Sequence, residues 1–300
     1  MFKKGIVLSA VFPDIKSDYG QLVQALGRIA ASGLFSGVEF YFTGSDEEYR
    51  KIGGILQESH LYNVFLPGFE MKRDCLDLGS DSEAIRLHAI KKCREFVRTA
   101  YLMHARKMLI LSGPKPADGD IGAYSDRFIC SLEAVLAYSK SQAAAYSLEV
   151  TLEFFNDVGE PWLAIGNVHA VQKICEPLCT RFDNFGITFD TSHVAQLRGD
   201  LAVYYAALAP YVHHLHLANC VTRDPLDPLF GDKHPVFNLA QGDFSDDDMA
   251  DFVNHVKKGR YFEGIDICSY EIIPQGEMHS DASFQSLLAS ASCIWAKTGG

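Results

Sequence analysis

The sequence lacks several features that mark common functional classes. None of its eight cysteines belongs to a CxxC pair, so the usual spacing of a zinc ribbon or a dithiol redox site is absent. No apolar run approaches the ~18–20 residues that cross a bilayer. Basic residues number 27 against 38 acidic ones, giving a net charge of −11 that opposes binding to nucleic-acid phosphates. We therefore expect a cytoplasmic protein with reduced thiols that binds neither membrane nor nucleic acid.

The sequence does contain enough apolar residues for a large core, arranged in a regular alternation. Hydrophobic residues make up 48% of 300. Short apolar runs, typical of buried strands, alternate with segments that have apolar residues at helical spacing. The candidate strands are residues 5–12, 37–42, 63–69, 107–114, 147–155, 185–191, 212–220 and 264–273. No Ser/Gly-rich linker interrupts them, so we predict one domain, residues 1–300, folded as a (β/α)8 TIM barrel.

An open, doubly wound sheet is the alternative fold, but no glycine-rich phosphate-binding turn follows the first candidate strand.

One connection between the predicted elements is unusually long. Residues 221–243, after the seventh strand, combine Pro, Phe and Leu with charged residues and show little periodicity. Loops longer than about 12–15 residues are uncommon unless they bind or cover something. We predict a lid, with an ordinary surface excursion as the alternative.

The last four candidate strands repeat one polar pattern. Each has Glu, Asp or His near its C-terminal end and another polar residue two positions earlier, on the same side of the strand. The pairs are Glu153 with Thr151, Asp190 with Thr188, His216 with His214, and Glu271 with Ser269. Barrel interiors usually hold Val, Ile and Leu at these positions. Each residue alone is consistent with a solvated strand end or a core histidine, but the repetition indicates a shared site.

Three converging carboxylates would repel one another, and a divalent cation would remove that repulsion. We therefore predict one metal ion bound by Glu153, Asp190, His216 and Glu271, with the earlier polar residues orienting these ligands. Three carboxylates and one imidazole favour Mn²⁺, Mg²⁺ or Co²⁺. Zn²⁺ remains open.

These motifs also carry a resemblance to a known family. The segments "LEFFN" (152–156), "FDTSH" (189–193) and "HLHLAN" (214–219), together with Glu271, resemble the xylose isomerase-like TIM-barrel superfamily. Within it they are similar to the sugar phosphate isomerase/epimerase group, which includes ketose epimerases. The resemblance implies the same metal set, and substrate contacts from Glu160, His193 and Arg223.

The chain departs from the family pattern at three points. Glu160 and Arg223 are each spaced about one residue further than expected from their metal ligand. The segment "GDKHP" (231–235) in the long connection is not part of the common pattern. It contains His234, which we add to the predicted substrate-binding residues because it can donate a hydrogen bond to a sugar oxygen or a phosphate.

The predicted site suits proton abstraction next to a carbonyl, through an enediolate. Glu153 and Glu271 are the predicted acid and base, and the substrate is a small sugar or sugar phosphate. The sequence does not separate epimerisation from aldose–ketose isomerisation. The alternatives are a lyase of the inositol-dehydratase type, an endonuclease-like hydrolase that the net charge disfavours, and a sugar-binding protein without turnover. A homo-oligomer is left open.

Overall fold

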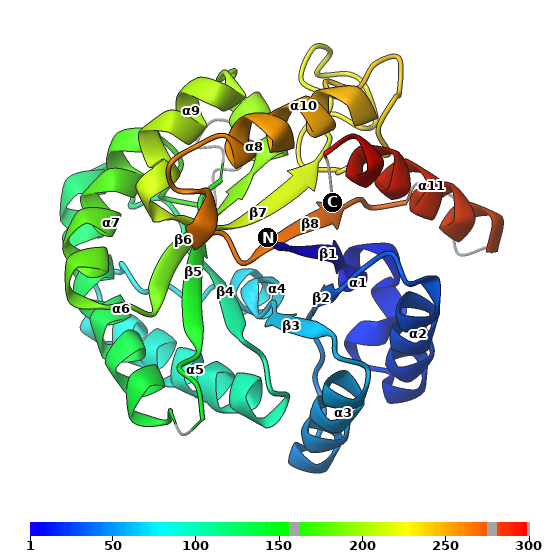
Figure 1. The fold of residues 1–300 in the computed structure, drawn as a ribbon. Coiled ribbons are helices and arrows are strands. Elements are labelled where there is room, and N and C mark those ends of the chain that lie inside the picture. Colours follow the sequence, from blue (N-terminus) through cyan, green and yellow to red (C-terminus); the bar gives the residue numbers. More distant parts are fainter. Residues whose placement is uncertain (144, 156–162, 275–280, 299–300) are drawn as a thin grey trace.

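The computed structural model describes residues 1–143, 145–155, 163–274 and 281–298. Eight parallel strands close into a barrel in sequence order, and helices surround it (Figure 1). The predicted TIM barrel is confirmed. The strands are β1 Lys3–Val7, β2 Gly37–Phe40, β3 Tyr62–Phe65, β4 Lys107–Leu111, β5 Glu149–Glu153, β6 Phe185–Asp190, β7 Val212–Ala218 and β8 Ile267–Glu271.

Helices follow the strands around the outside of the barrel (Figure 1). The α-helices are α1 Leu8–Val11, α2 Tyr19–Ser32, α3 Asp46–Glu58, α4 Gly68–Arg73, α5 Glu83–Leu102, α6 Ile121–Ser141, α7 Val168–Arg181, α8 Thr191–Gln196, α9 Leu201–Leu208, α10 Asp246–Lys257 and α11 Asp281–Lys297. The 3₁₀ helices are η1 Pro13–Lys16, η2 Ala209–Tyr211 and η3 Phe262–Gly264. None of the helices in the described ranges is both long and apolar enough to cross a membrane.

The first predicted strand, 5–12, is wrong in its second half. The strand ends at Val7, and Leu8–Val11 form the short helix α1. The apolar run "LSAV" continues without a break after the strand, and a short apolar run alone does not distinguish strand from helix.

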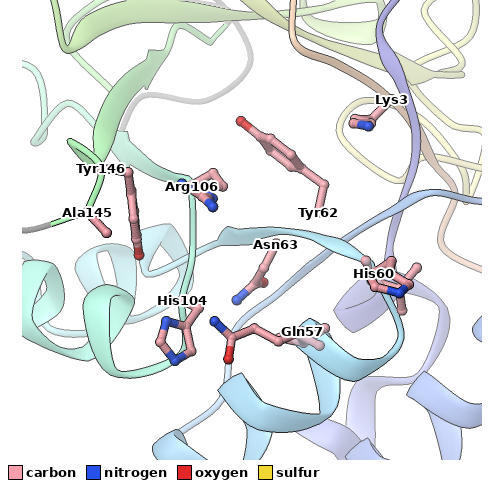
Figure 2. Close-up of a pocket in the computed structure, with 11 residues that line it drawn as sticks. Lys3, Gln57, His60, Tyr62, Asn63, His104, Arg106, Ala145 and Tyr146 are labelled. Atoms are coloured by element: carbon pink, nitrogen blue, oxygen red, sulfur yellow. The ribbon is translucent and has the colours of Figure 1, made fainter.

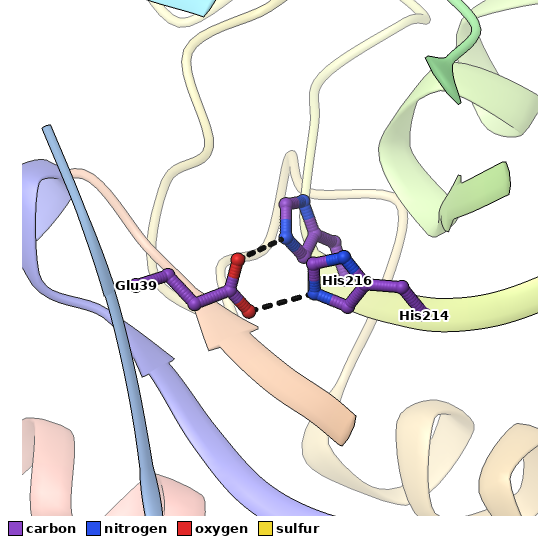
Figure 3. Close-up of side chains that lie close together, drawn as sticks. All are labelled: Glu39, His214 and His216. Atoms are coloured by element: carbon purple, nitrogen blue, oxygen red, sulfur yellow. Dashed lines mark hydrogen bonds and ion pairs between the residues drawn. The ribbon is translucent and has the colours of Figure 1, made fainter. Parts of the chain in front are cut away.

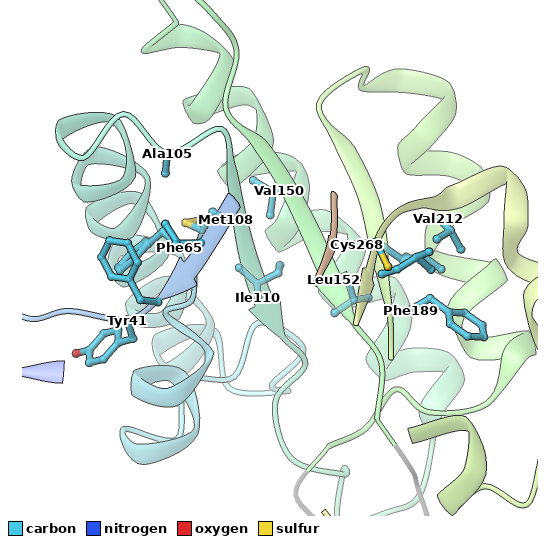
Figure 4. Close-up of a cluster of buried hydrophobic side chains, with 14 of the residues drawn as sticks. Tyr41, Phe65, Ala105, Met108, Ile110, Val150, Leu152, Phe189, Val212 and Cys268 are labelled. Carbon is cyan, nitrogen blue, oxygen red and sulfur yellow. The ribbon is translucent and has the colours of Figure 1, made fainter. Parts of the chain in front are cut away.

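The outward-facing residues of the barrel strands form the main hydrophobic core. Figure 4 shows Ile110, Leu152 and Phe189 among its side chains, and all three are buried. The Phe189 ring stacks on Phe252 of α10, with ring centroids 5.7 Å apart. Because strand residues alternate between faces, this packing leaves the neighbouring position Asp190 inside the barrel, as the sequence pattern predicts.

The strand register aligns the polar residues of neighbouring strands. Asp190 on β6 is level with His216 on β7, and His216 is level with Ser269 on β8. Glu271 is level with Ala218, two residues beyond His216. The carboxyl ends of β6, β7 and β8 therefore place their polar side chains at similar depths in the barrel.

Residues 219–245, between β7 and α10, contain neither helix nor strand. One hydrogen bond closes this segment on itself near its start, where the Gly231 N–H donates to the Val221 carbonyl over 3.0 Å. Another attaches it to the barrel, because the Ile273 N–H, just past β8, donates to the His234 carbonyl over 2.8 Å. The segment is therefore held against the ends of β7 and β8, next to the polar cluster.

Candidate active site

The four predicted metal ligands meet at the carboxyl end of the barrel. His216 Nδ1 lies 2.7 Å from Glu271 Oε2, 3.1 Å from Glu153 Oε1 and 3.7 Å from Asp190 Oδ2. One ligand atom from each of the four residues lies within 4.8 Å of the others. Glu153, Asp190 and His216 are buried, and Glu271 is partly buried. The structure thus brings together the set that the strand pattern predicts.

The polar residues expected beneath the ligands are also inside the barrel. The Thr188 hydroxyl donates to Thr151 Oγ1 over 2.9 Å and lies 3.0 Å from His214 Nδ1. Ser269 Oγ is buried without a hydrogen-bond partner among the described residues. Three of the four residues therefore form a hydrogen-bonded chain across β5, β6 and β7. This chain ends at a residue that the sequence analysis did not assign.

That residue is Glu39 on β2, which bridges the two histidines of β7 (Figure 3). Its Oε1 is 2.7 Å from His214 Nε2, and its Oε2 is 3.1 Å from His216 Nε2. All three side chains are buried. Because the Nε2 of His216 faces Glu39, its Nδ1 is directed at Glu153, Asp190 and Glu271. The only sequence signal for Glu39 is a carboxylate inside the apolar run "GVEFYF".

The electrostatics of the cluster are set by burial and by carboxylate–imidazole contacts. Burial alone would lower the pKa of His216, but Glu271 and Glu39 raise it well above its ordinary value. Burial raises the pKa of Glu153 despite its hydrogen bond to His216. Burial would also raise the pKa of Asp190, but His193, His234 and His216 hold it below the usual range. Positive charge placed among these carboxylates would offset their mutual repulsion, which is what a bound cation would do.

Two oxygen atoms of the cluster test whether a cation fits. Asp190 Oδ2 is buried and makes no hydrogen bond among the described residues, and the buried Glu271 Oε2 faces only His216 Nδ1, at 2.7 Å. The other oxygen of Asp190 caps α8, accepting from the Ser192 N–H over 2.6 Å and from the Ser192 hydroxyl over 2.6 Å. Buried oxygens without donors are costly unless something else binds them. Together with one imidazole they form a ligand set that suits a hard divalent cation.

Two predicted substrate-binding histidines lie next to this cluster. The His193 ring packs on Phe155, with centroids 3.8 Å apart, and its Nε2 is 3.9 Å from Glu153 Oε1. His234 Nε2 is 3.0 Å from Asp232 Oδ1. The backbone of His234 has a φ of 39°, a left-handed conformation that costs energy for a residue other than glycine.

Asp232 was not identified from the sequence, although it stands two residues before His234 in "GDKHP".

Two other groups of side chains could also hold a metal ion. Asp190, His193 and His234 form one group, whose ligand atoms lie within 4.8 Å of one another. A third such group is made up of Glu39, His214 and His216. In that group the imidazoles and the carboxylate are already paired, so it orients His216 without presenting free ligand atoms.

Arg223, another predicted substrate-binding residue, is not part of the cluster described so far. The Arg223 side chain is 68% exposed, and its Nε lies 3.4 Å from Asp243 Oδ1. Glu160 lies outside the described residues. The predictions for these positions are not tested by the structure.

A cavity of about 220 Å³ opens beside the cluster. Glu153, His216, Asp232 and Glu271 form its acidic wall. The rest of the lining is mainly apolar and includes two lysines, with Val7, Lys16, Leu66, Phe69, Lys72, Leu109, Leu111 and Phe155 among the lining residues. His193, His234 and Arg223 are not among the described residues that line it.

A larger cavity of about 480 Å³ lies at the other end of the barrel (Figure 2). Its lining includes Lys3 and Tyr62, the first residues of β1 and β3, together with Arg106 and Tyr146. No acidic residue is among the described residues that line it. Catalytic groups of TIM barrels lie at the carboxyl ends of the strands, so the cavity beside His216 is the candidate active site.

Comparison with known proteins agrees with this fold. A family model described as xylose isomerase-like TIM barrel matches residues 26–287. No curated protein matches the sequence. A D-tagatose 3-epimerase-like protein is similar in structure, with a TM-score of 0.72, 16% identity, and coverage of 99% of this chain and 100% of that one.

Two further solved structures are similar at low identity. An L-ribulose 3-epimerase has a TM-score of 0.71 at 16% identity, covering 99% of this chain and 93% of that one. An AP endonuclease of family 2 from Brucella melitensis has a TM-score of 0.66 at 17% identity, covering 95% and 98%. At these identities the structural likeness shows the fold, while the family model covers most of the sequence. The chain belongs to the xylose isomerase-like TIM-barrel family.

Proposed function

We propose that this protein is a divalent-metal-dependent isomerase or epimerase of a small sugar or sugar phosphate. The observation that carries the proposal is the convergence of Glu153, Asp190, Glu271 and His216 Nδ1 beside a cavity. Sugar epimerases among the similar structures support this class of reaction. The alternatives that share the barrel, a dehydratase or a sugar-binding protein, would use the same cavity and are separated by the experiment below.

Glu153, Asp190, His216 and Glu271 would hold the ion. When bound, the ion would polarise the substrate carbonyl and stabilise the enediolate that forms after proton loss. Glu153 and Glu271 both line the cavity and stand on β5 and β8, with β6 and β7 between them. One would remove a proton from the carbon next to the carbonyl, and the other, or the same one, would return it. Burial raises the pKa of Glu153, which is the direction expected for a carboxyl group that both accepts and returns a proton.

Substrate positioning would come from residues around the acidic wall. Phe155, Leu109 and Leu111 line the cavity and would limit access of water to a reactive intermediate. We propose that His193 and His234 donate hydrogen bonds to substrate oxygens that reach into the cluster. Contacts from Arg223 and Glu160 remain part of the proposal through the family resemblance.

The test is proton exchange in D₂O, with Mn²⁺ and a panel of ketopentoses, ketohexoses and their phosphates. NMR would detect deuterium next to the carbonyl even where net conversion is small. Glu153→Gln and Glu271→Gln should each abolish exchange, because each removes an acid or base. Glu149→Gln is a matched control, since Glu149 lies at the start of β5, paired with Lys107 and His213.

A keto-deoxy product would identify a dehydratase and contradict the isomerase proposal. Ligand binding without exchange of any substrate C–H proton would indicate a binding protein instead. Near-normal exchange in Glu153→Gln or Glu271→Gln would remove that residue from the proposed chemistry.

A further inference from the structure

The candidate cavity has two chemically different walls. The acidic wall comes from β5, β7 and β8 and from Asp232, as described above. Elsewhere in the lining, Lys16 follows β1 in η1, and Lys72 belongs to α4, which follows β3. The charge of Lys72 helps to lower the pKa of Asp232, so Lys72 lies near that carboxylate. These two lysines are the only Lys or Arg residues among the described residues that line the cavity. A neutral sugar bound through its carbonyl and hydroxyls does not require this positive side.

Lys16 is held in a defined position. Its carbonyl accepts a hydrogen bond from the Thr43 N–H over 2.9 Å, which attaches η1 to the segment that follows β2. Its ammonium nitrogen lies 4.4 Å from the centroid of the Phe69 ring, within the range of a cation–π contact. Phe69 lines the same cavity. The positive charge is therefore fixed at the cavity wall by the backbone and by an aromatic face.

The charge of Lys16 lacks an acidic partner in the described ranges of the chain. Lys51, Lys140 and Lys173 each have a carboxylate oxygen within 2.8 Å, whereas the contact found for the Lys16 ammonium is the Phe69 ring. Lys16 is partly buried, and burial lowers its pKa. Desolvating an ammonium group without a counter-ion is unfavourable, so an anion at this wall would stabilise it.

We propose that Lys16, with Lys72 beside the same cavity, binds an anionic group of the substrate. The substrate class is then an acidic sugar derivative, with its carbonyl end at the Glu153–Glu271 wall and a phosphate or carboxylate at the Lys16 wall. This inference rests on the proposed function for the assignment of the carbonyl end. The anion itself is recognised by charge and by the aromatic face, independently of turnover.

The experiment uses polyols, which have no carbonyl and cannot react. Binding of ribitol, ribitol 5-phosphate and ribonate to the Mn²⁺-loaded protein would be measured by calorimetry. Charge-assisted hydrogen bonds to one lysine predict that an anionic ligand binds about 10- to 100-fold more tightly than ribitol. The phosphate and carboxylate ligands are separate arms, and the tighter one identifies the anion. Added salt should reduce the preference.

Variants then assign the preference to Lys16. Lys16→Met removes the charge at similar length and should bring anionic and neutral ligands to within about threefold of each other, while Lys16→Arg should retain most of the preference. Lys4→Met is the matched control, because Lys4 is also partly buried, and its ammonium lies 6.0 Å from the Trp295 ring centroid, outside the cavity lining.

Equal affinities for ribitol and both anions in the unmodified protein would overturn the proposal. So would an anion preference that survives Lys16→Met. Anion preference without proton exchange on any ketose would keep this inference and reject the isomerase function, so the two failures are distinguishable.

Discussion

The bridge from Glu39 to His216 yields a prediction about metal affinity. Glu39→Gln keeps the size of the side chain but removes its charge. The amide oxygen can still accept from His216 Nε2, and the amide NH₂ can donate to His214 Nε2 if the His214 Nδ1–H donates to Thr188 Oγ1, which lies 3.0 Å away. The variant should therefore fold with both contacts in place, and the main loss is the negative charge behind the His216 imidazole, the proposed metal ligand.

The expected loss of Mn²⁺ affinity in Glu39→Gln follows from the contact between Glu39 and His216. A buried hydrogen bond to a charged group contributes about 1.5–3 kcal/mol, and the Glu39 Oε2 to His216 Nε2 distance of 3.1 Å is long for such a bond. The lower part of that range applies, so about 1.5–2 kcal/mol should be lost from metal binding. This corresponds to a dissociation constant for Mn²⁺ raised about 10- to 30-fold, within the range typical of residues that orient a metal-bound histidine.

The assay is a titration of free Mn²⁺ by electron paramagnetic resonance, with circular dichroism to verify the fold. Glu149→Gln serves as the control, because it also removes a partly buried carboxylate that contacts a β7 histidine, His213, at the opposite end of the barrel. An unchanged Mn²⁺ affinity in Glu39→Gln, or an equal loss in Glu149→Gln, would refute the orienting role of Glu39.

Further predictions concern the proposed metal ligand Asp190, the neighbouring His193, and Glu149 at the opposite end of the barrel. Chelation should abolish proton exchange, and added Mn²⁺ should restore it; exchange in a chelated sample that mass spectrometry shows to be metal-free would contradict this metal dependence. Asp190→Asn should bind Mn²⁺ at least about tenfold more weakly, because an amide supplies no charge. His193→Asn should keep the metal content but raise KM or lower kcat, and loss of the ion would make His193 a ligand. Burial would raise the pKa of Glu149, but Lys107 and His213 lower it from 4.5 to about 2, so its stabilisation is present above about pH 4.5 and is lost as pH falls toward 2. Glu149→Gln should therefore reduce the free energy of unfolding at pH 7 by about 3 kcal/mol, and denaturant unfolding should show this difference shrinking in acid; a difference independent of pH would contradict it.

The parts of the site that could be predicted from the sequence are those that depend on strand periodicity. Alternation along β5, β6, β7 and β8 placed Glu153, Asp190, His216 and Glu271 on one side of their strands. Parallel strands in sequence order then bring these ends together. Both steps are local rules, and the observed register satisfies them.

Residues whose position depends on tertiary contacts could not be predicted in the same way. Glu39 lies within β2, and its contact with β7 crosses the barrel interior. Asp232 and His234 belong to residues 219–245, where no periodicity indicates which side chains turn inward. Their position depends on the hydrogen bonds at Val221 and Ile273, and on a left-handed backbone at His234.

The buried Glu39 bridge also bears on why two histidines share one face of β7. Burying a carboxylate and two imidazoles costs more in lost hydration than their pairing returns in many proteins, and apolar residues of similar size often stabilise a core better. A barrel interior filled by Val, Ile and Leu would be the simpler solution. The contact with Glu39 instead holds the His216 ring so that its Nδ1 faces three carboxylates. These belong to Glu271, Glu153 and Asp190, at 2.7, 3.1 and 3.7 Å. The contacts among Glu39, His214 and His216 are therefore better explained by the orientation of His216, the proposed metal ligand, than by the stability of the barrel. Removing the Glu39 charge should weaken metal binding more than it lowers the free energy of unfolding.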